Sequence, residues 1–88
     1  MDNQRLLRMA NQIGAFFESY PDRAEAVAGV ANHLRSFWAP VMRRQIIEYA
    51  AGGGGAEMKD IVRDAVAVLA RETAARDAAG TGGEKRNF

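Results

Sequence analysis

Hydrophobic residues recur at intervals of three and four along most of the chain, a spacing that places them on one face of an α-helix. Four segments show this pattern and predict helices at about residues 3–19, 22–38, 41–51 and 56–78. In the first helix, Phe16 widens the hydrophobic stripe. No stretch alternates hydrophobic and polar residues with the period of two that indicates a strand. The pattern therefore predicts an all-α fold, a small bundle of three to four helices.

Proline and glycine residues mark the boundaries between these segments. Pro21 ends the first helix because its ring removes a backbone donor, and Asp22 then offers an N-cap oxygen to the second helix. Pro40 stands where the third helix begins, a position that suits its fixed φ angle. The four glycines at 52–55 predict a flexible loop, since glycine loses the most backbone entropy in a helix.

Chain length limits the architecture to one domain. A chain of 88 residues has too small a core for a second folded unit. We expect a single helical domain over residues 1–79. Residues 80–88 combine glycines and mixed charges with one apolar residue, so they predict a flexible, disordered C-terminal tail.

Composition excludes several classes of protein. With no cysteine, the chain can form no disulfide, no thiolate zinc site and no cysteine-ligated iron–sulfur cluster. No apolar run approaches the ~18 residues of a membrane span, and the polar first residues lack the apolar stretch of a secretory signal. We expect a cytoplasmic protein with no membrane partner.

Charge is balanced overall but unevenly distributed. The net charge of +1 is too small to indicate a nucleic-acid binder, so we expect no nucleic-acid partner. Between Glu25 and Glu48 there is no carboxylate, although the stretch contains three arginines, a histidine and a tryptophan. This basic and aromatic region is either a solvated helix face or a surface for an acidic or phosphate-bearing partner.

Residues that could carry chemistry are few and isolated. His33 is the single histidine, and its neighbours one helical turn away, among them Gly29 and Phe37, supply no second metal ligand. No serine stands in a Gly-x-Ser-x-Gly elbow, and Asp60 and Asp64 share a helix face that we expect to be exposed. We find no candidate active site, and we expect this chain to bind no metal or cofactor and not to be an enzyme.

Two kinds of residue are unusual for the interior of a helix. Asn11 is a poor helix former, so its side chain either hydrogen-bonds to another element or lies on the surface. Gly14 and Gly29 each cost about 1 kcal/mol relative to alanine, which is either simply tolerated or a sign that two helices approach closely there. Phe37 and Trp38 are neighbouring large apolar residues. If they are buried, they belong to the core of the chain, and if they are exposed, they are an anchor for a partner protein.

The sequence resembles a known family over roughly residues 6–47. The resemblance rests on RMANQIG at 8–14, FF at 16–17, AGVANHL at 28–34 and FWAPVMR at 37–43. This combination is similar to the delta subunit of NAD-dependent, molybdenum-containing formate dehydrogenases. Asn32 stands where the family pattern leads us to expect an aspartate.

The resemblance implies a non-catalytic accessory subunit. Other chains of such enzymes hold bis-molybdopterin guanine dinucleotide, iron–sulfur clusters and FMN, and they pass electrons from formate to NAD. The delta chain is expected to bind the catalytic alpha subunit and to support its assembly, cofactor retention or stability. The absence of cysteine agrees, because this chain cannot itself ligate iron–sulfur clusters.

We expect the partner interface to involve the first two helices and the corner at residues 37–44. The two arginines of the corner would pair with carboxylates or cofactor phosphates. His33 and Asn11 would make oriented hydrogen bonds, and Trp38 would be the anchor. The expected interface residues are Asn11, His33, Phe37, Trp38, Pro40, Met42, Arg43 and Arg44.

Two other functions stay open at this point. A nucleic-acid-binding module would place Arg35, Arg43 and Arg44 on one surface, and it would bind duplexes with a steep salt dependence. A self-associating bundle would bury the surplus apolar surface against a second copy and would sediment as a discrete dimer.

Overall fold

The chain has an all-α fold in the computed structural model, which describes residues 2–86 and, for side chains, residues 2–78. Over the described range there are four α-helices, one 3-10 turn and no strand. The elements in chain order are α1 (Asn3–Phe17), α2 (Arg23–Phe37), α3 (Pro40–Ala51), η1 (Gly54–Glu57) and α4 (Asp60–Arg86). The predicted small bundle of helices is confirmed.

Side-chain caps define where the first two helices begin. The carboxylate of Asp2 accepts a hydrogen bond from the backbone N–H of Gln4 at 3.1 Å, and α1 starts directly after it. The Asp22 carboxylate accepts from the N–H groups of Ala24 and Glu25 at 2.9 and 3.3 Å, which confirms the predicted cap of α2. α1 and α2 end at residues 17 and 37, slightly before the predicted ends at 19 and 38.

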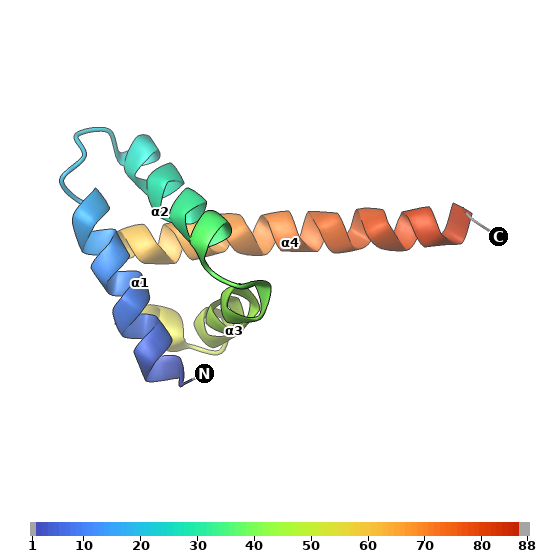
Figure 1. The fold of residues 1–88 in the computed structure, drawn as a ribbon, viewed down its shortest axis with the longest axis horizontal. Helices are drawn as coiled ribbons and strands as arrows, with labels where there is room; N and C mark the ends of the chain where they lie inside the picture. Colours follow the sequence, from blue (N-terminus) through green and yellow to red (C-terminus); the bar gives the residue numbers. More distant parts are fainter. Residues whose placement is uncertain (1, 87–88) are drawn as a thin grey trace.

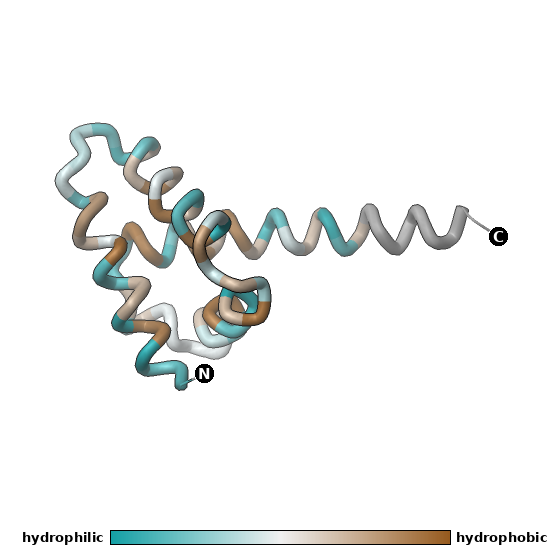
Figure 2. Tube along the Cα trace, viewed as in Figure 1, coloured by the Kyte–Doolittle hydropathy of each residue, from teal (hydrophilic) through white to brown (hydrophobic). Residues whose placement is uncertain are grey.

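α4 is the element against which the others pack. It contacts α1, α2 and α3, and α1 and α2 cross in front of its first half in the view of Figure 1. Hydrophobic residues recur along the helices where they approach one another (Figure 2). Each α-helix contributes to the core, and burial of one such side chain stabilises the fold by about 1.5–3 kcal/mol. The largest fully buried side chains are Leu6, Val30, Leu34, Ile46, Ile61 and Val62.

Two helical glycines lie where another part of the chain approaches closely. A Cβ atom added to Gly14 would lie 2.5 Å from Cγ2 of Val62, so α1 and α4 approach closely at this point. A Cβ atom on Gly29 would lie 2.4 Å from Cε1 of Phe17. The predicted close approach is therefore confirmed at Gly14, and at Gly29 the approaching group is an aromatic ring of α1.

The glycine run at 52–55 forms a packed turn rather than the flexible loop that the sequence predicted. Gly53 has a φ of 106°, which favours glycine over other residues. The Tyr49 ring lies against Gly54, where an added Cβ would be 2.3 Å from a ring carbon. The Tyr49 hydroxyl donates a hydrogen bond to the Glu57 carboxylate, and this bond raises the pKa of the hydroxyl.

The start of α4 is later than the pattern predicted. The helix begins at Asp60 and not at residue 56, because residues 54–57 form η1 and Met58 is extended. The Arg63 guanidinium donates to the carbonyls of Gly55 and Met58 at 3.0 and 3.2 Å, so the first turn of α4 is tied to η1.

The end of α4 also differs from the prediction. Its backbone is helical to Arg86, past the predicted end at residue 78. The described side chains at 74–78 are exposed, and this part of the helix projects away from the other three (Figure 1). The predicted disordered tail at 80–88 falls on residues whose side chains lie outside the described range, so it stays a prediction.

Candidate partner-binding surface

The described part of the chain offers little for chemistry. No three His, Cys, Asp or Glu side chains among the described residues lie close enough to hold a metal ion, and none of the described charged side chains is buried. In that same range, no helix combines the length and the apolar character needed to cross a membrane. Two grooves between helices of the described chain are candidates for binding a partner.

The first groove, which we call the α1–α2 groove, lies between α1 and the end of α2. It has a volume of about 520 Å³. Five residues of α1 line it, namely Met9, Gln12, Ile13, Phe16 and Phe17, together with His33 and Trp38. Apart from Gln12 and His33, these side chains are apolar. The groove therefore suits a ligand that brings apolar side chains of its own.

Exposed aromatic rings border the α1–α2 groove. Phe16 is 65% exposed although the pattern placed it on the hydrophobic stripe, because no described element covers its side of α1. Phe37 is 75% exposed, and its ring lies 4.8 Å from the His33 ring, centroid to centroid. Phe17 packs edge-on against Phe16, with ring centroids 5.0 Å apart. Large apolar side chains exposed together are characteristic of interaction surfaces.

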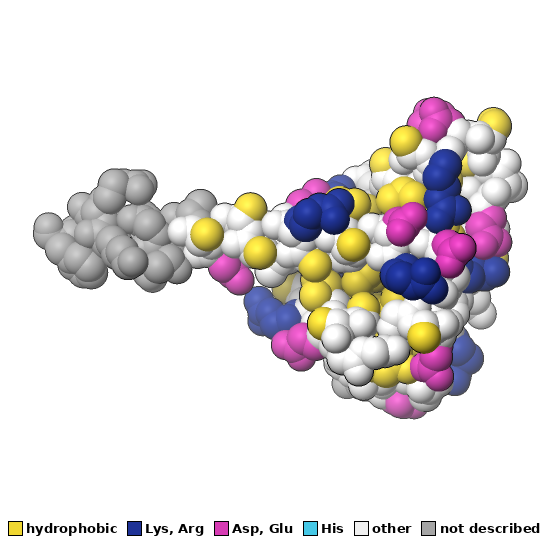
Figure 3. All heavy atoms as spheres, turned by 180° about the vertical axis from the view of Figure 1, so that it is seen from behind, with side chains coloured by type: hydrophobic (Ala, Val, Ile, Leu, Met, Phe, Trp, Pro, Cys, Tyr) yellow, Lys and Arg dark blue, Asp and Glu magenta, His cyan; other side chains and the backbone are white. Residues whose placement is uncertain are grey.

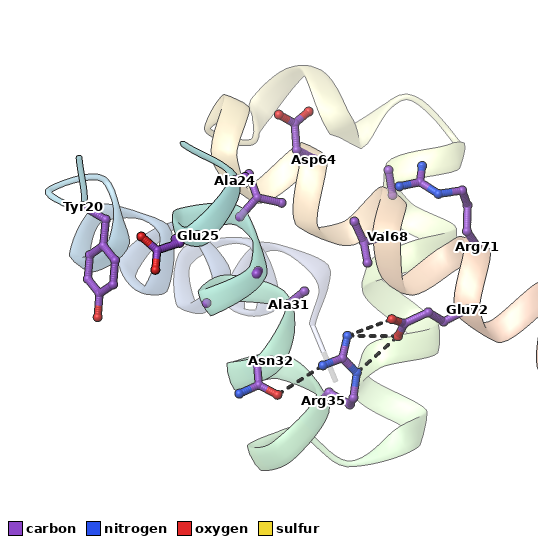
Figure 4. Close-up of a pocket in the computed structure, with 14 residues that line it drawn as sticks. Tyr20, Ala24, Glu25, Ala31, Asn32, Arg35, Asp64, Val68, Arg71 and Glu72 are labelled. Carbon is purple, nitrogen blue, oxygen red and sulfur yellow. Dashed lines mark hydrogen bonds and ion pairs between the residues drawn. The ribbon is translucent and has the colours of Figure 1, made fainter. Parts of the chain in front are cut away.

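The second groove, the α2–α4 groove, is larger but already bridged by the chain itself. Its volume is about 910 Å³. The Arg35 guanidinium forms a two-pronged ion pair with Glu72, in which Nε donates to Oε1 at 3.2 Å and Nη2 donates to Oε2 at 2.9 Å (Figure 4). Its Nη1 also donates to the Asn32 amide oxygen at 3.2 Å. Arg71 and Glu25 also line this groove. Acidic and basic groups are therefore mixed there.

Asn11 forms its hydrogen bonds within the chain. Its Nδ2 donates to the carbonyl of Glu57 at 3.3 Å, and its Oδ1 accepts from the backbone N–H of Lys59 at 3.1 Å. The prediction that this side chain hydrogen-bonds to another element is confirmed. The amide joins α1 to the junction between η1 and α4, so its contribution to a partner interface stays a prediction.

Arg43 closes the corner between α2 and α3. Its Nη1 donates to the carbonyls of Arg35, at 3.2 Å, and of Trp38. The last carbonyls of a helix have no partner within the helix, and a guanidinium there also interacts favourably with the helix dipole. Arg43 thus caps α2, and its expected pairing with carboxylates or phosphates of a partner stays a prediction.

The remaining predicted interface residues divide by exposure. Trp38 is only 6% exposed and belongs to the chain's own core, so Phe37 is the exposed member of the pair. Arg44 is exposed and makes no ion pair or hydrogen bond among the described residues. Pro40 is exposed and Met42 half-buried. Of the three arginines at 35, 43 and 44, Arg35 is paired with Glu72 and Arg43 donates to backbone carbonyls of the α2–α3 corner.

Sequence reasoning missed three surface residues of α1. Arg5, Arg8 and Phe16 are exposed on the helix. Arg5 and Arg8 lie four positions before Met9 and Gln12 of the α1–α2 groove, a spacing that makes them neighbours on the helix surface. That spacing was visible in the sequence, but the position of α2, which decides which face of α1 stays open, was not.

Comparison with known proteins identifies a family. Residues 5–66 match the family model described as NADH-dependent formate dehydrogenase delta subunit FdsD. The match runs from α1 to the first turns of α4 and includes every residue that lines the α1–α2 groove. A search of curated proteins and a search of solved structures found no match.

Proposed function

Because this chain belongs to the NADH-dependent formate dehydrogenase delta subunit family, we propose that it is a non-catalytic accessory subunit of a cytoplasmic enzyme. It binds the large molybdenum-containing alpha subunit and supports the assembly, cofactor retention or stability of that subunit. The other subunits would carry the bis-molybdopterin guanine dinucleotide, the iron–sulfur clusters and FMN, together with formate oxidation and NAD reduction.

The exposed aromatic surface at the α1–α2 groove is the observation that carries this proposal. Phe16, which lines the groove together with Ile13 and Trp38, exposes most of its side chain, and so does Phe37, whose ring contacts the groove residue His33. Burial of such rings in a partner would contribute a large share of the binding free energy, since a few anchors dominate most interfaces. We place the alpha subunit on this surface.

The other predicted interface residues take two roles in this proposal. His33 and Phe37 contact the partner directly, and Pro40, Met42 and Arg44 extend the surface along the start of α3. The other three predicted residues, Trp38, Asn11 and Arg43, contribute indirectly, by stabilising the fold around the surface. They hold the groove floor, the η1–α4 junction and the α2–α3 corner in place, respectively.

Removal of the two exposed rings tests the proposal. A tagged Phe16→Ala, Phe37→Ala chain, expressed in its own cells, should recover at least tenfold less alpha subunit than the wild type, with unchanged helicity by circular dichroism. Formate-dependent NAD reduction in the recovered material should fall in parallel. Arg71→Ala removes a side chain of comparable size from the α2–α4 groove and should recover the complex normally. Full recovery by the double variant would contradict the proposed interface.

A further inference from the structure

The charged residues of α1, the helix that supplies most of the α1–α2 groove, are both basic. Between Asp2 and Glu18, α1 carries two arginines and no carboxylate. Arg5 precedes Met9 by four residues and Arg8 precedes Gln12 by four, so both arginines extend the groove side of α1 toward its N-terminus. None of the residues that line the groove is acidic.

Both arginines lack partners within the described part of the chain. Arg5 and Arg8 are exposed, and neither forms an ion pair or hydrogen bond with a described residue. The carboxylates at the two ends of α1 are engaged elsewhere. Asp2 caps the helix, and Glu18 accepts from Lys59 of the α4 junction at 3.4 Å. The two guanidinium groups are therefore available to an external anion.

The face behind α4 differs in this respect. Figure 3 shows basic and acidic side chains lying among one another on that face. Away from the α1–α2 groove, two arginines of α2 are paired within the chain: Arg23 with Asp64 at 3.1 Å and Arg35 with Glu72 at 2.9 Å. A partner of one charge sign would find no matching surface there, whereas the α1–α2 groove presents apolar side chains beside unpaired cations.

We propose that the α1–α2 groove binds an acidic amphipathic segment of the partner subunit. Its apolar side chains enter the groove beside Phe16 and Phe37, and its flanking carboxylates pair with Arg5 and Arg8. This inference rests on the proposed function and adds the chemistry of the bound segment.

The groove favours such a peptide over a phosphate-bearing ligand. Its lining is mostly apolar, so an occupant that carried only charge would leave Ile13 and Phe16 in contact with water. A guanidinium presents paired N–H donors that match the two oxygens of a carboxylate, and such a pair at the rim of an interface favours binding of an acidic segment over a basic one.

Charge reversal on α1 tests the inference. The Arg5→Glu, Arg8→Glu variant should recover about tenfold less alpha subunit at low salt than the wild type, because the new carboxylates repel an acidic segment. Both positions are exposed in the first half of α1. Negative side chains near the N-terminus of a helix interact favourably with the helix dipole, so the variant should keep its helicity. The Arg5→Lys, Arg8→Lys variant keeps the charge and should retain most of the binding. Arg71→Glu, Arg76→Glu makes the same change of charge on α4 and should have no effect.

Photo-crosslinking identifies the occupant directly. With p-benzoylphenylalanine in place of Phe16 in the intact complex, we expect the crosslinked peptide to come from the alpha subunit and to combine apolar residues with aspartate or glutamate. A peptide without acidic residues, a nucleic acid or a second copy of this chain at that position would overturn the inference. Normal recovery by the charge-reversal variant would also overturn it. If the charge-reversal variant recovers the alpha subunit normally but the Phe16→Ala, Phe37→Ala variant does not, the acidic-segment inference fails and the proposed function stands.

Discussion

A single amide group, that of Asn11, connects α1 with two backbone groups beyond the glycine turn. Asn11→Ala removes the acceptor for the N–H of Lys59 and the donor to the carbonyl of Glu57. We expect the free energy of unfolding to fall by about 1–2 kcal/mol, since the better helix propensity of alanine offsets only part of the loss. A urea titration monitored by circular dichroism measures this change in the free energy of unfolding. Gln12→Ala on the neighbouring exposed position should change stability by less than about 0.5 kcal/mol. Equal stability of the Asn11 variant and the wild type would contradict this role.

For individual residues, the sequence predicted the type of interaction but not the residue that would be contacted. The poor helix propensity of Asn11 predicted a hydrogen bond, but its partners lie 46 and 48 positions away, and no local pattern indicates them. Phe16 and Trp38 both read as hydrophobic, and only the packing of the helices leaves the first 65% and the second 6% exposed. Arg43 caps α2 because of the geometry of the α2–α3 corner, which the sequence does not specify.

The contact between α1 and α4 depends on a position without a side chain. In Gly14→Ala the new Cβ would lie 2.5 Å from Cγ2 of Val62, a fully buried side chain with no room to move. We expect the free energy of unfolding to fall by about 1–3 kcal/mol, against the gain of about 1 kcal/mol from helix propensity. The matched control is Gly52→Ala, where the nearest atom is the carbonyl of Glu48 at 3.5 Å. It should change stability little, and a Gly14 variant as stable as this control would disprove the close contact.

Helices were easier to predict than the turn between them. Asp22 and Pro40 give clear start signals for α2 and α3, and both helices begin near the predicted positions. The predicted start of α4, at residue 56, was wrong because a 3-10 turn of four residues shows no recognisable hydrophobic period. The glycine run gave no sign that the Tyr49 ring would pack against Gly54 and order the turn.

Over the whole molecule, different residues provide stability and the proposed partner binding: the buried core stabilises the fold, and the exposed α1–α2 groove is the proposed binding surface. The described core is hydrophobic and draws on every α-helix, whereas the ion pairs that link α4 to α1 and α2 are exposed and contribute little, about 0–1 kcal/mol each. The α1–α2 groove lies on the open side of α1 and α2. Neither the groove nor its arginines could be derived from the pattern, because both depend on how the two helices cross.

The isolated chain should accordingly fold as a monomer. Since the core is complete without Phe16 and Phe37, we expect one cooperative urea transition whose midpoint is independent of protein concentration, and sedimentation at 9.6 kDa. Phe16→Ala, Phe37→Ala should change the free energy of unfolding by less than about 1 kcal/mol, although we expect the same variant to recover at least tenfold less alpha subunit. Leu34→Ala, at a fully buried position, should cost about 2–5 kcal/mol. A midpoint that rises with protein concentration would instead show that the two rings are buried against a second copy, and that the chain is a self-associating bundle.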